Sequence, residues 1–286
     1  MKQTLSRWFR VKAELSRKER LIIGVVGVFF IFACWHLITS IGWVPKQILP
    51  NPFDVLSAFP DMLHPTGSEN DPVKIEALRK KDLLFNLWNS VQVNFWGLGE
   101  ALALSIPIGL AIGLFSPINA IMGKFTNNIR YLPLTAVIGL FVVNFGIGMA
   151  FKAHFLAAGI FVYLMPAIAK LTDEVAVAHK NTARTLGASE WELVTTVYFP
   201  AVMKKAKGTI INLMAVSWTY IIIAENYYQE YGIGMLAWKA GRVRNYEQLY
   251  AILIVIFIFG LLQDWAVKNS FKFIGDIWKR YFNLQK

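Results

Sequence analysis

Polar side chains recur at helical spacing within two apolar stretches of this sequence. Four of them follow one another at steps of three, four and four residues: Asn89, Gln92, Trp96 and Glu100. Three more recur every seven residues: Asn212, Thr219 and Asn226. Each set lies on one face of its predicted helix. Such a face can line a water-filled path for a polar solute, or it can hydrogen-bond to a neighbouring helix.

Glu100 is an acidic residue well inside an apolar stretch. An acidic side chain at the centre of a membrane helix costs about 3 kcal/mol, so we expect a specific environment to offset that cost. Two interpretations stay open: the carboxylate lines a path, or it is a neutral carboxyl bonded to a neighbouring helix. The second is favoured for an anionic solute, which a bare carboxylate would repel.

The composition places these stretches in a membrane. Of the 286 residues, 56% are hydrophobic and 16% are charged, and the mean hydropathy is +0.45, whereas a soluble domain carries about 25% charged residues. The net charge of +11 does not indicate nucleic-acid binding, because the basic residues lie between the apolar stretches and not on one folded face. The single cysteine, Cys34, can form no internal disulfide, and the four histidines lack the spacing of metal ligands.

Six stretches are long and apolar enough to cross a bilayer, which takes about 20 residues. Their approximate bounds are Leu21–Ile41, Leu87–Leu114, Tyr131–Ile147, Phe151–Leu171, Gly208–Tyr228 and Gln248–Lys268. We therefore predict an all-α polytopic membrane protein. Its parts are an N-terminal segment at 1–20, a first transmembrane helix at 21–41, an external loop at 42–85, a core domain at 86–270 and a C-terminal tail at 271–286.

The distribution of Lys and Arg orients the predicted helices. With the N-terminus inside, most of the 29 basic residues fall in or beside the inner segments, as the positive-inside rule requires. We therefore expect both termini, and the polar loop at 172–207 within the core domain, to lie in the cytoplasm.

That polar loop contains a predicted helical elbow that ends at Pro200. No Gly or Pro occurs from Asp173 to Leu186, which predicts a helix, and Gly187 can take the left-handed conformation that closes one. Ser189, with Glu192 three residues later, has the pattern of a capping box that begins a second helix. Pro200, about two turns beyond, is expected to end that second arm.

The elbow resembles the EAA loop of permease subunits in binding-protein-dependent ABC importers. That pattern is Glu-Ala-Ala, three residues, Gly, nine residues, and then Ile-x-Leu-Pro. Three positions match it in register: Ala183, Gly187 and Pro200. Two positions carry other apolar residues: Val197 and Phe199. Asn181 and Thr182 replace the Glu and the first Ala, so the acidic side chain of the first position is missing here.

Other segments are similar to the nitrate/sulfonate/taurine branch of these permeases. They are Ala183 to Ser189, Leu49-Pro50-Asn51-Pro52, and Ala224-Glu225 ahead of Tyr231-Gly232-Ile233-Gly234. The resemblance covers nearly the whole chain beyond Arg20. It implies the type I ABC-importer permease fold in a bacterial inner (plasma) membrane. Glu225 is expected to be structural more than substrate-binding.

The resemblance also implies partners and site residues. The partners are two cytoplasmic ABC ATPase subunits that hold ATP-Mg, a second permease copy in a homodimer, an external solute-binding protein and the lipid membrane. The residues that would couple to the ATPase are Asn181, Thr182, Ala183, Gly187, Ala188, Ser189, Trp191 and Pro200. The solute would be small and mostly anionic, such as nitrate, a sulfonate, taurine or bicarbonate, although relatives also carry thiamine precursors.

The motifs of catalysis are missing from the sequence. It contains no Gly-x4-Gly-Lys-[Ser/Thr] phosphate loop, His-Glu-x-x-His, nucleophile elbow or cysteine pair, so we expect no catalytic, cofactor or metal site and no ATP hydrolysis by this chain. Two alternatives stay open: an ATP-independent secondary transporter, for which Glu100 and Asp264 would be candidate coupling acids, and a non-transporting membrane scaffold. Three basic residues in the last outer loop could attract an anion: Lys239, Arg242 and Arg244.

Overall fold

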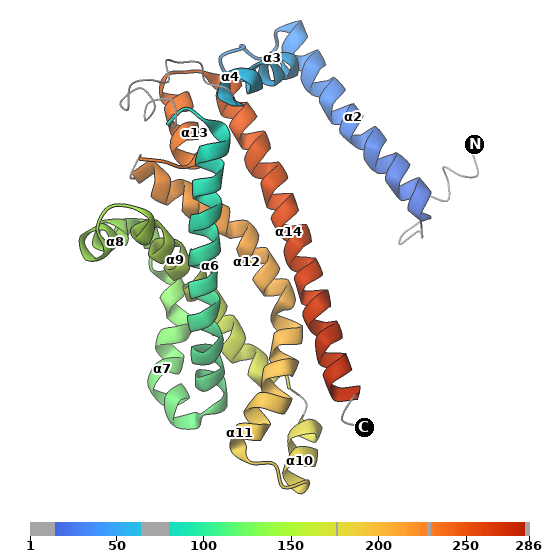
Figure 1. Cartoon of the computed structure of the whole chain (residues 1–286), viewed down its shortest axis with the longest axis vertical. Coiled ribbons are helices and arrows are strands. Elements are labelled where there is room, and N and C mark those ends of the chain that lie inside the picture. Colours follow the sequence, from blue (N-terminus) through green and yellow to red (C-terminus); the bar gives the residue numbers. More distant parts are fainter. Residues whose placement is uncertain (1–14, 64–79, 176, 228–229, 284–286) are drawn as a thin grey trace.

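The computed structural model describes residues 15–63, 80–175, 177–227 and 230–283 of this chain, and within them every regular element is a helix (Figure 1). The predicted N-terminal segment up to residue 14 and the middle of the predicted external loop, residues 64–79, lie outside the described residues. The long helices are α2 (Arg17–Ile41), α6 (Leu83–Leu114), α9 (Met149–Asp173), α12 (Phe199–Tyr227) and α14 (Tyr246–Asn283). They confirm the all-α membrane fold, because each belongs to a helical segment long and apolar enough to cross a bilayer.

Five of the six predicted spans are thus confirmed, with longer helices than predicted. The helices extend beyond the apolar stretches because polar residues cap them outside the apolar core. Ser16 caps α2 through a capping box with Glu19, and Asp82 accepts a hydrogen bond from the N–H of Phe85 at the start of α6. At the other end of the chain, α14 continues through the predicted C-terminal tail as far as Asn283.

The third predicted span, Tyr131–Ile147, is wrong as a single helix. The chain instead forms α7 (Ser116–Asn128), two short 3-10 turns and α8 (Ile138–Phe145), and the two parts of this broken span are bent by 93°. Pro133 lies at the break; its fixed φ and missing N–H prevent a continuous helix there. Helix α7 was not predicted from the sequence, because polar residues interrupt its apolar face.

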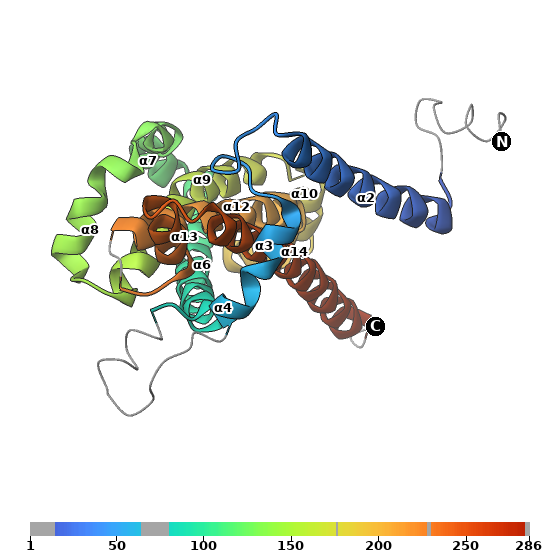
Figure 2. The same cartoon turned by 90° about the horizontal axis from the view of Figure 1, so that it is seen from above.

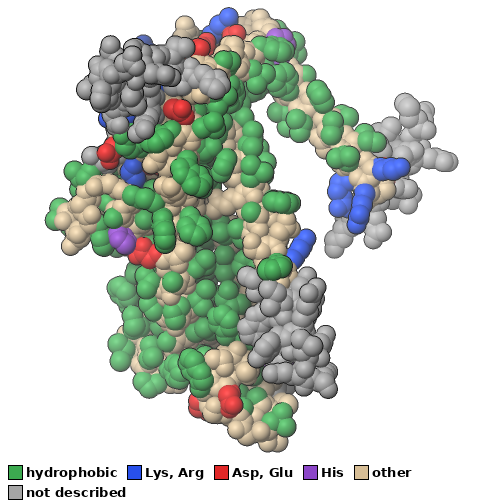
Figure 3. Space-filling model, in the orientation of Figure 1, with side chains coloured by type: hydrophobic (Ala, Val, Ile, Leu, Met, Phe, Trp, Pro, Cys, Tyr) green, Lys and Arg blue, Asp and Glu red, His purple; other side chains and the backbone are tan. Residues whose placement is uncertain are grey.

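The helices form a bundle with distinct ends. The short helices α3 (Pro52–Ser57), α4 (Phe59–Leu63) and α13 (Ile233–Arg242) lie at one end, and the elbow formed by α10 (Val177–Thr185) and α11 (Glu190–Glu192) lies at the other (Figure 1). In both views α2 leans away from the other helices (Figures 1 and 2). The face seen in Figure 3 is mostly hydrophobic along the bundle, as expected for helices that meet lipid or a second protein.

Helices α6 and α9 pack against each other in parallel through glycines of α6. A Cβ atom on Gly97 would lie 2.8 Å from the carbonyl oxygen of Ala153, and one on Gly109 would lie 2.7 Å from that of Met165. Gly113 meets α9 one turn further along. Gly109 and Gly113 therefore form a pair of small residues, four apart, that packs on α9.

We expect Gly109→Ala to destabilise the bundle by about 1–3 kcal/mol, because its methyl group would overlap both the backbone of Met165 and the side chain of Ile168. Gly99→Ala is the matched control on the same helix, since a Cβ at Gly99 meets nothing within 4 Å. Thermal unfolding of the two variants in detergent measures the difference. Equal unfolding temperatures would contradict the close packing of α6 on α9.

A fully bonded polar network joins α6 to α12 and α14. The amide of Asn94 donates to Ser217 Oγ at 2.9 Å and accepts from Gln263 Nε2 at 3.0 Å, and Trp218 Nε1 donates to Gln263 Oε1 at 2.6 Å. Since the partners come from three helices, α6, α12 and α14, this network fixes how they pack.

Candidate functional site

The elbow begins where α10 ends, in a fixed backbone geometry. Gly187 has φ of +84°, which confirms the predicted left-handed conformation. The N–H of Ala188 donates to the carbonyl oxygen of Ala183 and the N–H of Gly187 to that of Arg184, both at 3.0 Å. These two bonds form a Schellman motif, which satisfies carbonyl groups at the end of a helix. The chain therefore reverses direction without a flexible loop.

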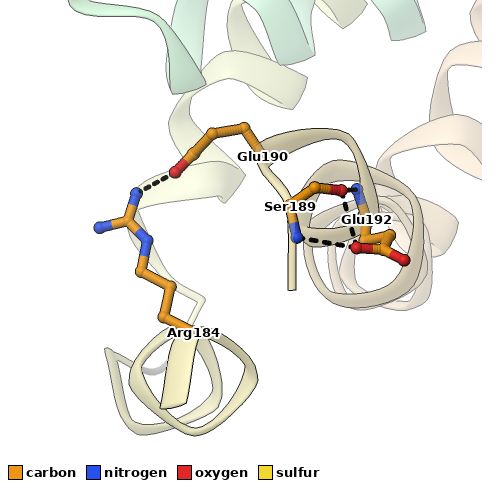
Figure 4. Close-up of polar contacts among 4 residues, drawn as sticks. All are labelled: Arg184, Ser189, Glu190 and Glu192. Carbon is orange, nitrogen blue, oxygen red and sulfur yellow. Dashed lines mark hydrogen bonds and ion pairs between the residues drawn. The ribbon is translucent and has the colours of Figure 1, made fainter. Parts of the chain in front are cut away.

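The second arm begins with the predicted capping box. Glu192 N–H donates to Ser189 Oγ at 3.3 Å, and Ser189 N–H donates to Glu192 Oε2 at 2.7 Å. Arg184 and Glu190 form an ion pair of 2.7 Å across the bend (Figure 4). Both of its side chains are exposed, so it contributes at most about 1 kcal/mol. The backbone motifs, more than this ion pair, hold the angle between the arms.

The prediction that Pro200 ends the second arm is wrong. Helix continues from Glu190 to Tyr227, passing through a π-helical segment, Leu193–Tyr198, into α12. The N–H of Phe199 donates to the carbonyl of Val194, five residues back. This wider turn moves the backbone away from the proline ring, which would clash with the carbonyl four residues back in an α-helix. The arm of the elbow is therefore continuous with a membrane-spanning helix.

The elbow presents apolar side chains to its surroundings. Leu186 is 81% exposed and Trp191 is 73% exposed. Of the other predicted coupling residues, some are exposed (Asn181, Thr182, Gly187 and Ser189) and some are half-buried (Ala183, Ala188 and Pro200). A groove of about 490 Å³ lies between the arms, lined by His179, Thr182, Ala183, Leu186, Thr196, Val197, Pro200, Ala201 and Lys204. The sequence argument missed Leu186, whose signal is an apolar residue at the end of a polar helix.

The polar face of α6 contributes to a cavity of about 700 Å³ between α6 and α9. It is lined by Phe95, Trp96, Gly99, Glu100, Ala103, Met149, Ala150, Ala153 and His154. Glu100 is bonded to the neighbouring helix, because His154 Nδ1 lies 2.8 Å from its Oε2, and each side chain is 33% exposed. The carboxyl group of Glu100 thus contacts α9 and also lines a cavity, and its role in a path stays a prediction.

His154 was missed by the sequence argument, which considered the histidines only as metal ligands. Its ring lies 4.1 Å from that of Phe145, centroid to centroid. No spacing in the sequence relates His154 to Glu100, 54 residues away. Only the parallel packing of α6 and α9 brings these two residues together.

The remaining predicted path residues lie outside this cavity. Asn89 and Gln92 are half-buried nearer the start of α6, and Asn89 Nδ2 donates to the carbonyl of Phe85 at 2.8 Å. On α12, Asn212 and Thr219 are exposed and Asn226 is half-buried. None of these five residues lines the cavity that contains Trp96 and Glu100.

Glu225 is the centre of a buried polar cluster at the end of the bundle that carries α13. Its carboxylate accepts hydrogen bonds from Ser90 Oγ at 2.6 Å and from the N–H of Gly234 at 2.7 Å, and the side chain is fully buried. Gly232 has φ of +129°, and a Cβ there would overlap the carboxylate of Glu225. The glycines of this segment are therefore needed for close approach to the acid.

Neighbouring contacts complete the cluster. The N–H of Gly232 donates to Asn86 Oδ1 at 2.8 Å, and Lys152 Nζ donates to the carbonyl of Tyr231 at 2.7 Å. Lys152 is itself buried, so a basic side chain belongs to the same cluster. A buried carboxylate with this many donors is a structural group, which agrees with the expectation for Glu225.

Comparison with known proteins agrees with this geometry. Residues 105–274 match the family described as binding-protein-dependent transport system inner membrane component. The taurine transport system permease protein of Escherichia coli (strain K12) is 24% identical over 263 residues, which cover 92% of this chain and 91% of that protein. The putative aliphatic sulfonates transport permease protein of the same organism is 24% identical over 277 residues, covering 91% and 90%.

The fold is also similar to that of a solved transporter. An inward-facing MetNI methionine ABC transporter chain aligns with a TM-score of 0.60 and 16% identity, covering 66% of this chain and 94% of that chain. At this identity the likeness concerns the fold alone. About a third of this chain lies outside that alignment.

Proposed function

This chain belongs to the family of inner membrane components of binding-protein-dependent transport systems, and from this premise we propose how it works in an ABC importer. It forms the translocation path for a small anionic solute, and a separate ATPase drives it through the elbow at residues 181–200. Membership of this family favours this function over the two alternatives, an ATP-independent secondary transporter and a non-transporting membrane scaffold.

The observation that carries the proposal is the continuity between the elbow and the membrane. The elbow is rigid at Gly187 and at Ser189, and its second arm continues as one helix to Tyr227. The same helix carries the polar residues Asn212 and Thr219. A displacement of the elbow therefore reaches the proposed path without crossing a flexible joint, whereas a loop would absorb it.

Membership of the family supports a set of partners for this chain. Two cytoplasmic ATPase subunits, which hold the ATP-Mg, would each receive one elbow, and the exposed Leu186 and Trp191 would supply apolar contact area. A second copy of this chain would cover the polar faces of α6 and α12. An external solute-binding protein would dock at the opposite end, where α3, α4 and α13 lie (Figure 1).

The cavity at Glu100 supports a path that passes beside α6 and α9. Glu100 of α6 and His154 of α9 are polar side chains that are partly exposed. Contact with lipid would be costly for both, so we expect them to face a protein or a water-filled space. The second permease copy would supply that cover. The hydrogen bond from the His154 ring engages the Glu100 carboxyl group, which would otherwise face an anionic solute. The names of the taurine and sulfonate permeases among the relatives support a sulfonate-like solute.

A single cysteine tests both the orientation and the docking of the elbow. Cys34 is the one native cysteine, so Ser189→Cys in a Cys34→Ser background carries a unique thiol on the exposed elbow. We expect a membrane-impermeant maleimide to leave it unlabelled in intact cells and to label it in inverted membrane vesicles. ATPase subunits bound to those vesicles should protect it, because the elbow would lie in their groove.

The matched control is Trp43→Cys in the same background. Trp43 is 78% exposed and lies at the end of α2 opposite the elbow side, so its cysteine should be labelled in intact cells. Labelling of the Ser189→Cys thiol from outside would overturn the cytoplasmic placement. Full labelling in vesicles that retain the ATPase would overturn the docking.

A further inference from the structure

A second polar pocket lies at the end of the molecule that carries α13. It has a volume of about 820 Å³ and is lined by α4, α13, the start of α14 and the two residues before Asp82. Four basic side chains and one acidic side chain line it: Lys80, Lys81, Lys239, Arg242 and Asp61. Arg244, which the sequence grouped with Lys239 and Arg242, does not line it. The structure thus brings two of the three basic residues of the predicted outer loop, Lys239 and Arg242, to the same pocket as Lys80 and Lys81.

Lys239 and Arg242 are the two cations of α13 that line this pocket. Among the described residues, no carboxylate lies within ion-pair distance of Lys239 or Arg242. Burial, with the positive charge of Lys80 adding to it, lowers the pKa of Lys239. The Arg242 guanidinium lies 4.7 Å from the ring centroid of Trp238, which holds it beside the pocket. Cations crowded in this way are stabilised by a bound anion.

We propose that this pocket binds the oxyanion group of a small sulfonate or phosphate compound. Arg242 presents a planar fork of donors that matches two oxygens of such a group, and Lys239 adds a point charge from the neighbouring turn of α13. Gln248 also lines the pocket and adds a neutral hydrogen-bonding side chain. If the proposed function holds, the pocket is an outer site that collects the solute before it enters the path.

The reactivity of Lys239 provides the test. Acylation requires the neutral amine, so a lowered pKa raises the reactive fraction of Lys239, and a bound anion slows acylation by covering the amine and favouring the ammonium form. The protein is placed in nanodiscs of phosphatidylcholine and treated with a low dose of an amine-reactive acetyl ester. Mass spectrometry then measures acetylation at Lys239 and at Lys46, an exposed lysine of the loop before α3.

We expect millimolar ethanesulfonate to reduce acetylation of Lys239 by about threefold, the effect of a ligand at roughly twice its dissociation constant. Acetylation of Lys46 should not change. Chloride at the same ionic strength should protect neither lysine. In Arg242→Gln, Lys239 should still be acetylated but ethanesulfonate should no longer protect it.

The control arms separate the sources of the oxyanion and the outcomes that overturn the site. Nanodiscs that contain phosphatidylglycerol would protect Lys239 without added sulfonate if a lipid headgroup is the occupant. Two results would overturn the proposal: chloride protects Lys239 as well as ethanesulfonate does, or neither ethanesulfonate nor phosphatidylglycerol protects Lys239 of the wild-type protein. The assay uses neither ATPase nor uptake, so its failure would leave the labelling of the elbow, and the proposed function, as they stand.

Discussion

We expect Gly187→Val to insert in the membrane normally but to uncouple ATP hydrolysis from solute uptake. A β-branched residue is strained at the φ of +84° that Gly187 adopts, and the cost of about 2 kcal/mol corresponds to a factor of about 30 in the population of the native bend. The strain is relieved by opening the Schellman motif, which rotates α10 away from the second arm. Uptake by whole cells should fall by at least about tenfold, while the purified complex still hydrolyses ATP.

Gly187→Asn is the matched control for the bend. Asparagine tolerates the left-handed conformation better than other residues with a side chain, and a Cβ at this position meets nothing within 4 Å. We therefore expect this variant to retain most of the uptake. Normal uptake by Gly187→Val would count against transmission through the elbow, and equal loss in both variants would point to a surface contact at Gly187 instead of its backbone geometry.

Gly232→Ala is expected to have the largest effect on stability. The added methyl group would overlap the buried carboxylate of Glu225, and the φ of +129° is unfavourable for alanine. Expelling Glu225 would leave the N–H of Gly234 without its acceptor and the hydroxyl of Ser90 with only the carbonyl of Asn86, so we expect a loss of about 3 kcal/mol or more. The amount of protein in the membrane and its unfolding temperature in detergent measure the effect.

Two further variants separate the causes of that loss. Gly42→Ala also places alanine at positive φ, +78°, but its Cβ meets nothing within 4 Å, so we expect only about 1–2 kcal/mol from backbone strain. Glu225→Gln keeps the shape of the side chain but loses one acceptor, and an intermediate loss should result. A Gly232→Ala protein as stable as Gly42→Ala would mean that α13 can be detached from Glu225 without cost.

The elbow was largely predictable because its signals are local. A glycine in the left-handed conformation and a Ser–Glu capping box each act within a few residues, so Gly187 and Ser189 indicate their own geometry. Pro200 was misjudged although it is also a local signal. Its usual effect on an α-helix does not apply after a π-helical turn, and the sequence does not indicate that turn.

The sequence by itself determined the membrane class, five spans and both ends of the bend, since hydrophobic length and helix capping depend on residues close together in the chain. Tertiary structure alone decided which polar groups meet. Glu100 contacts His154 54 residues away, Glu225 contacts Ser90 135 residues away, and the pocket at Lys239 forms only because α13 folds back beside the start of α6. In each case helix packing provides the contact, because side chains at any sequence distance can meet once two helices lie side by side.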